Sequence, residues 1–153
     1  MKIRDVIIVI VGIVIDILTK LSIVNNYDLY ESTEIISNFF RITYIQNDGA
    51  AWSILEGQMF FFYIITIVAI VFIGYLYKSF DDSFQKFSIA LIFAGTIGNF
   101  IDRIRLGYVV DFLDFTIFGY DFPVFNVADS CLVVGCALLI ISFIKEEKTN
   151  GKI

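Results

Sequence analysis

The chain has 153 residues, of which 58% are hydrophobic and 18% are charged, and its mean hydropathy is +0.82. This composition is too apolar for a soluble domain and predicts an integral membrane protein. The net charge of −5 with scattered Lys and Arg argues against a nucleic-acid partner, which needs a basic stripe. The chain has no histidine, so Ser-His or Cys-His chemistry and imidazole metal ligands are excluded and acid–base work falls to carboxylates.

The first apolar segment, residues 6–24, predicts a membrane-spanning helix. It follows Lys2 and Arg4 and so imitates a signal peptide, but Asp16 and Lys20 interrupt it and no small-x-small cleavage site follows. We therefore expect it to be retained. Asp16 and Lys20 are four residues apart, which places them on one helix face as partners, either for function or as a simple ion pair that settles a helix end.

The longest polar stretch, residues 25–57, separates this span from a second one expected over residues 59–77. Within the polar stretch, residues 39–45 are rich in aromatic and β-branched side chains, which predicts a strand near the membrane surface. A short polar link, residues 78–86, leads to the next span.

A third span is expected over residues 87–101, before Asp102 and Arg103, and its small residues favour close helix packing. Residues 106–123 alternate aromatic and acidic side chains, which is typical of a second interfacial strand or loop. A fourth span is expected over residues 126–144.

These segments predict one integral membrane domain, residues 1–153, with an all-α core of four transmembrane helices and a small extracytoplasmic β element on the membrane surface. Basic residues are enriched in cytoplasmic flanks, so their distribution predicts the orientation. One side holds Lys2, Arg4, Lys78, Lys86, Lys145, Lys148 and Lys152, and the other holds Arg41, Arg103 and Arg105. Both termini should therefore be cytoplasmic, with residues 25–57 and 106–123 on the outer side.

Two aspartates, Asp111 and Asp129, each lie at the edge of an apolar segment, where an ionisable group is costly and indicates function. If the two carboxylates lie close together they cannot both ionise cheaply, so we expect them to share a proton. The charged member would draw a proton from water while its partner hydrogen-bonds a carbonyl. Asp129, near the start of the fourth span, would feel the positive end of that helix and is the better candidate for the base.

Four polar patches carry these and other candidate residues. They are Asp16-Ile17-Leu18-Thr19-Lys20, Asn47-Asp48-Gly49-Ala50-Ala51-Trp52-Ser53, Gly98-Asn99-Phe100-Ile101-Asp102-Arg103, and Val109-Val110-Asp111-Phe112 followed by Phe125-Asn126-Val127-Ala128-Asp129. In this order, and within a four-span chain, they closely resemble the lipoprotein signal peptidase family, also called signal peptidase II, of bacterial intramembrane aspartyl proteases.

This resemblance implies an aspartic endopeptidase with Asp111 and Asp129 as its catalytic pair. It implies substrate-binding or supporting roles for Asp16, Lys20, Asn47, Gly49, Ala50, Asn99, Asp102, Arg103 and Asn126. The implied substrate is a prolipoprotein with a diacylglyceryl cysteine, cut just before that cysteine. We further expect no metal or other cofactor, membrane lipid as a partner, a monomer, and a place in the bacterial cytoplasmic membrane with the active site towards the outer face.

Two other classes of function fit parts of the sequence. A small transporter could use Asp16, Asp102, Asp111 and Asp129 as a proton relay, but it would spread carboxylates through the membrane depth, whereas these are expected to cluster at one face. A membrane scaffold would explain the hydrophobicity but not the polar patches.

Overall fold

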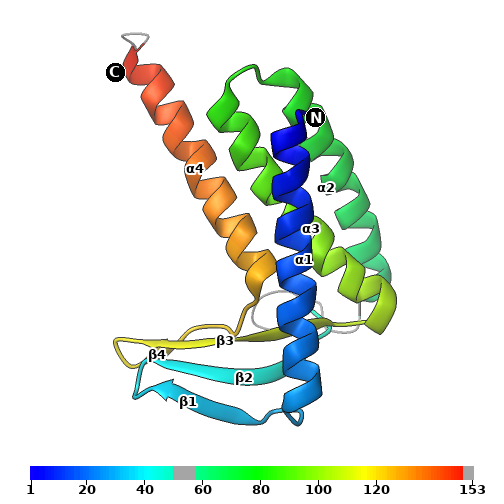
Figure 1. Cartoon of the computed structure of the whole chain (residues 1–153), viewed down its shortest axis with the longest axis vertical. Coiled ribbons are helices and arrows are strands. Elements are labelled where there is room, and N and C mark those ends of the chain that lie inside the picture. The colour runs from blue at the N-terminus through cyan, green and yellow to red at the C-terminus, as the bar shows by residue number, and fades with distance from the viewer. Residues whose placement is uncertain (50–57, 150–153) are drawn as a thin grey trace.

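The protein, seen in a computed structural model that describes residues 1–49 and 58–149, is a helical bundle with a sheet at one end (Figure 1). Its described residues form helices α1 (Ile3–Asn26), α2 (Met59–Ser79), α3 (Ser83–Leu106) and α4 (Val127–Thr149). All four are long and apolar enough to cross a membrane. The predicted fold class is confirmed.

The third span is longer than the sequence analysis predicted. Helix α3 begins after Asp82, whose carboxylate accepts two backbone N–H groups of the first turn, and ends at Gly107, whose φ of 79° suits glycine. Asp102 and Arg103, which we expected to follow the span, therefore lie inside the helix. Their charges end the apolar run in the sequence. The helix nevertheless continues, because Asp102 is buried and forms an ion pair with Lys20 of α1.

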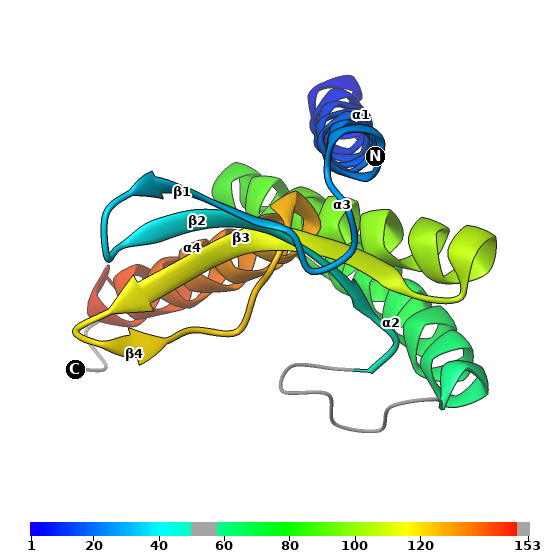
Figure 2. The same cartoon turned by 90° about the horizontal axis from the view of Figure 1, so that it is seen from below.

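Helix α3 lies at the centre of the bundle and packs against each of the other three helices. In Figure 2 it crosses the middle of the molecule. Its small residues make this approach possible: a Cβ at Gly95 would clash with the carbonyl oxygen of Ala128, and one at Gly98 would lie 2.8 Å from Asp16 Oδ2. The close contact brings α1 and the start of α4 against the same stretch of α3.

The sheet has the antiparallel order β1-β2-β3-β4, formed by β1 (Ser32–Ile36), β2 (Phe40–Asn47), β3 (Val109–Ile117) and β4 (Tyr120–Asp121). Strand β2 confirms the strand predicted at residues 39–45, while β1 was not predicted. The register places Asn47, at the end of β2, opposite Val109, and Ile45 opposite Asp111. Two segments far apart in sequence thus deliver Asn47 and Asp111 to one place.

An apolar cluster fastens the sheet to the bundle. Ile23 near the end of α1 packs with Tyr44 of β2 and with Val110 and Phe112 of β3, and all four are buried. Burying such side chains is favourable by roughly 1.5–3 kcal/mol each. The start of β3 is therefore held against the helices that carry the other polar patches.

Candidate active site

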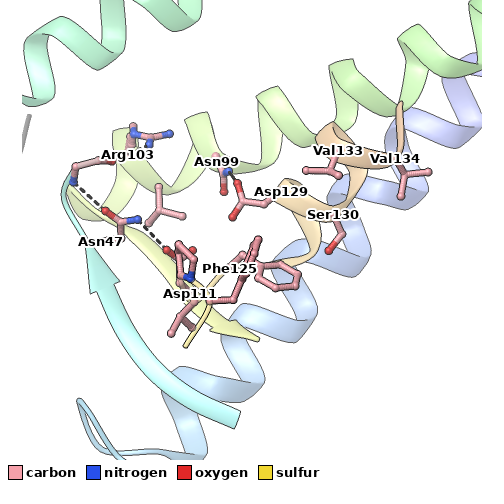
Figure 3. A pocket seen from close by; sticks show the side chains of 14 residues that line it. Asn47, Asn99, Arg103, Asp111, Phe125, Asp129, Ser130, Val133 and Val134 are labelled. Carbon is pink, nitrogen blue, oxygen red and sulfur yellow. Dashed lines mark hydrogen bonds between the residues drawn. The ribbon is translucent and has the colours of Figure 1, made fainter. Parts of the chain in front are cut away.

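A cavity of about 500 Å³ lies where α3, α4, β3 and the link before α4 meet (Figure 3). Its polar lining consists of Asn47, Gly49, Asn99, Arg103, Asp111, Asp129 and Ser130. Its apolar wall consists of Val109, Phe122, Pro123, Val124, Phe125, Val133 and Val134. Asp111 and Asp129, which the sequence analysis selected as a pair, therefore line one cavity.

Asp111 is a buried carboxylate held by two amides. Asn47 Nδ2 donates to its Oδ2 at 2.9 Å, and Asn126 Nδ2 donates to its Oδ1 at 2.6 Å. Burial raises the pKa of Asp111 to about 7, with the nearby charge of Asp129 acting in the same direction, although both amides oppose the shift. This carboxyl group can therefore hold a proton near neutral pH.

Asp129 owes its position to the way α4 begins. Asn126 immediately precedes the helix; its Oδ1 accepts the N–H of Asp129 at 2.9 Å, and Asp129 Oδ2 accepts the N–H of Asn126 at 3.2 Å. This reciprocal pair is a capping box, which satisfies two backbone donors that the first turn leaves free. The Asn-Val-Ala-Asp patch thus begins helix α4 and also holds the carboxylate of Asp129 in the cavity. The Nδ2 of Asn126 donates to Asp111 as well.

Asn99 connects Asp129 to a buried lysine. Its Nδ2 donates to Asp129 Oδ1 at 2.7 Å, and its Oδ1 accepts from Lys20 Nζ at 3.0 Å and from Asn126 Nδ2 at 3.1 Å. An ammonium group can only donate hydrogen bonds, so the amide oxygen of Asn99 must face Lys20. The amide nitrogen is then turned towards Asp129, whose carboxylate gains a donor.

Lys20 is the centre of a buried ion cluster behind the cavity. Only 3% of its side chain is exposed, and its Nζ lies 2.8 Å from Asp16 Oδ2 and 2.9 Å from Asp102 Oδ2. The pairing of Asp16 with Lys20 that the sequence analysis predicted is present. None of these three residues lines the cavity within the part of the chain that the structure describes.

The two carboxylates of this cluster also bind backbone. Asp16 Oδ1 accepts the N–H of Ala128 at 2.8 Å, and Asp102 Oδ2 accepts the N–H of Val110 at 3.2 Å. Ala128 and Val110 are the residues next to Asp129 and Asp111 in the chain. The cluster therefore holds the backbone next to Asp111 and Asp129 in place.

Arg103 lines the cavity from α3 and holds the end of β2. One of its terminal nitrogens donates to the carbonyl oxygen of Gly49 at 3.3 Å, while the guanidinium carbon lies 4.9 Å from the ring centre of Phe62. The N–H of Gly49 in turn donates to Asn47 Oδ1 at 3.0 Å. Ala50, the remaining candidate, lies outside the described residues.

The apolar wall of the cavity is what the sequence analysis missed. Residues 106–123 were expected to form an interfacial strand or loop and residues 126–144 a span, yet Phe122, Phe125 and Val133 line the same cavity as the carboxylates. No charge marks these residues in the sequence. A short aromatic link next to a helix-start motif is the one signal that could have indicated them.

Comparisons with known proteins place the whole chain in one family. A family model described as signal peptidase (SPase) II matches residues 8–145. Proteins called lipoprotein signal peptidase are similar: one from Staphylococcus haemolyticus (strain JCSC1435) is 48% identical over 140 residues, covering 90% of this chain and 89% of the relative. One from Staphylococcus aureus (strain JH9) is 46% identical over 136 residues, covering 88% of this chain and 83% of the relative.

A solved structure, described as a bacterial membrane enzyme determined by the in meso method at 2.3 Å resolution, has the same fold. Its TM-score is 0.91 at 42% sequence identity, covering 98% of this chain and 92% of that one. The match of the family model, the identity to the relatives and the shared fold each cover most of the chain. The chain therefore belongs to the signal peptidase II family of bacterial membrane proteases.

Proposed function

We propose that this protein removes signal peptides from prolipoproteins by aspartic hydrolysis, with Asp111 and Asp129 as the catalytic pair. The observation that carries the proposal is the placement of both carboxylates on one cavity, each with its own amide donors. Burial favours the protonated form of Asp111, and a paired acid and base needs one protonated member.

In the proposed reaction Asp111 starts protonated and hydrogen-bonds the carbonyl oxygen of the scissile bond. Asp129 has the role of the base: it lies in the first turn of α4, accepts a hydrogen bond from Asn99, and takes a proton from the attacking water. The hydroxide adds to the carbonyl carbon, and the carbonyl oxygen takes the proton of Asp111. The tetrahedral species then collapses, Asp129 passes its proton to the leaving amine, and Asp111 recovers its own.

The apolar wall supports a lipid-modified substrate. Phe122, Phe125, Val133 and Val134 offer a surface for acyl chains beside the polar groups that would meet the peptide. We propose a prolipoprotein whose cysteine carries a diacylglyceryl group, cut just before that cysteine. Both carboxylates come from one chain, so the proposal needs only a monomer.

The test is a cleavage assay with the purified protein. A prolipoprotein with diacylglyceryl cysteine should be cut between that cysteine and the residue before it, and mass spectrometry of both products identifies the bond. The same precursor without the lipid should be cut far more slowly. Cleavage at another bond, or no cleavage of the lipidated precursor by folded protein, would contradict the proposal.

The pH dependence of cleavage should reflect Asp111. The pair needs one proton, and Asp111 is neutral below a pKa of about 7 and charged above it, so kcat/KM should fall as the pH rises through this range. Asn47→Ala removes a donor that lowers this pKa and should move the falling limb to higher pH. Gln46→Ala is the control, because Gln46 donates to Tyr44 instead. Identical profiles for all three proteins would argue against Asp111 as the acid.

We also propose that both termini are cytoplasmic and that the sheet lies on the outer side of the membrane, as the basic flanks predict. In a variant without Cys131 and Cys136, single cysteines at Asn38 or Tyr120 should react with a membrane-impermeant thiol reagent on intact cells. A cysteine at Ser83, at the opposite end of the bundle, should not react. The reverse labelling pattern would place the cavity on the cytoplasmic side.

A further inference from the structure

A second cavity, of about 370 Å³, is lined by residues from the last turns of α2 and the first turns of α3. These turns lie at the end of the bundle opposite the sheet (Figure 1). Its apolar lining includes Ile73 of α2 and Ile89 and Phe93 of α3, and Ile73 and Ile89 are buried. Two basic side chains, Lys78 and Lys86, also line it. The cavity thus combines an apolar floor with positive charge at one membrane edge.

The two lysines that line this cavity are not in ion pairs with the described residues. Neither ammonium group forms a salt bridge with a carboxylate in residues 1–49 or 58–149. Lys86 Nζ lies 5.5 Å from the ring centre of Tyr77, which leaves its positive charge in place.

The carboxylate that contacts this tyrosine is already paired. Asp5 is fully buried and bound by Arg4 at 2.6 Å, and it accepts the Tyr77 hydroxyl at 2.6 Å. The carboxylate of Asp82 accepts backbone N–H groups at the start of α3. The two lysines therefore remain available for an anion from outside the chain.

A glycine widens the cavity. Gly74 lines it from α2, and a Cβ built there would meet nothing within 4 Å. Glycine within a helix costs about 1 kcal/mol relative to alanine. The position therefore leaves room beside Ile73 that a side chain could occupy without touching the protein.

We propose that this cavity binds an anionic phospholipid of the leaflet remote from the sheet. Lys78 and Lys86 would contact the headgroup phosphate, and the first part of one acyl chain would lie over Ile73, Gly74 and Phe93. Basic pockets between membrane helices suit anionic headgroups, and the apolar floor suits a chain. The site lies away from Asp111 and Asp129, so it does not depend on the proposed peptidase reaction.

Binding can be measured on the full-length protein in neutral detergent by titration with phosphatidylglycerol and with phosphatidylcholine of the same acyl chains, read by native mass spectrometry. The wild-type protein should prefer phosphatidylglycerol. Lys78→Gln and Lys86→Gln should each weaken binding of phosphatidylglycerol about fivefold and binding of phosphatidylcholine less, because the choline cation offsets the charge of the phosphate. Lys148→Gln, at the far end of α4, is the matched control and should leave both affinities unchanged.

Filling the cavity provides the second variant. Gly74→Phe should weaken the binding of both lipids about tenfold, because the new ring occupies the place of the acyl chain. Its thermal unfolding temperature should stay at or above that of the wild type. Equal affinity of the wild type for the two lipids, or equal losses in the Lys148 control, would overturn the proposal. So would a dimer in the same spectra that Gly74→Phe dissociates, since the occupant would then be a second copy of the chain.

Discussion

Asp111→Asn and Asp129→Asn should each lower the rate of prolipoprotein cleavage by about 10⁴-fold, the upper range for loss of a positioned acid or base. No histidine is present to take over the proton transfer. The change at residue 111 also has a structural cost. Both oxygens of Asp111 accept from amide nitrogens, so the nitrogen of an asparagine would face a donor. Rates should therefore be compared for variants whose thermal unfolding shows a folded protein.

Asp114→Asn is a matched control on the same strand. Asp114 is also buried, and it accepts from Arg41 at 2.9 and 3.1 Å and from Thr43 at 2.6 Å, but it does not line the cavity. The Asp114→Asn variant should unfold at a lower temperature than the wild type and still cleave the prolipoprotein.

Asp102→Asn should also harm cleavage less than either change in the pair, because both cavity carboxylates remain. Near-normal turnover in Asp111→Asn or Asp129→Asn would rule out the assigned pair. Equal, complete inactivation of well-folded Asp102→Asn would point to a different acid and base.

Lys20→Met should lower the free energy of unfolding by about 3–5 kcal/mol, the loss expected when one partner of a buried ion pair is removed. The change leaves Asp16 and Asp102 buried without their shared cation and removes a donor to Asn99. Isolated buried charges are costly, because desolvation is no longer offset by attraction. The thermal unfolding temperature in detergent should fall by about 10 °C, and cleavage should fall with it as the backbone next to Asp111 and Asp129 loosens.

A charge-neutral variant separates lost charge balance from lost contact. Lys20→Met combined with Asp16→Asn and Asp102→Asn removes all three charges, and Asn at residue 16 keeps an oxygen for the N–H of Ala128. This triple variant should recover most of the lost stability. Lys148→Met, which changes an exposed lysine near the end of α4, should leave the unfolding temperature unchanged. Unchanged stability in Lys20→Met would show that the buried ion cluster contributes little.

The parts of the fold that depend on local pattern could be predicted from the sequence. Apolar length indicated four spans, and the spacing of Asp16 and Lys20 indicated a pair on one helix face. The position of Asp129 in the first turn of α4 also followed from where the fourth apolar segment begins. These features need only residues that are close in the chain.

Contacts between distant segments could not be predicted in this way. The contact of Asp102 with Lys20 depends on how α1 and α3 are rotated against each other, and hydropathy does not specify rotation. The pairing of Asn47 with Asp111 depends on the register between β2 and β3. The apolar wall around Phe122 and Val133 has no polar marker, so only the packed structure reveals it. The family resemblance supplied the candidate residues, while their division into cavity lining and buried support comes from the geometry.

The most direct test of the paired aspartates is a crystal structure of the protein with a lipopeptide in which a hydroxyl-bearing, uncleavable group replaces the scissile bond. The tetrahedral hydroxyl mimics the attacked carbonyl. Its oxygen should lie within hydrogen-bond distance of both Asp111 and Asp129, with an acyl chain along Phe122 and Val133. A hydroxyl bound away from one of the two carboxylates, in a complex that inhibits cleavage, would contradict the assignment.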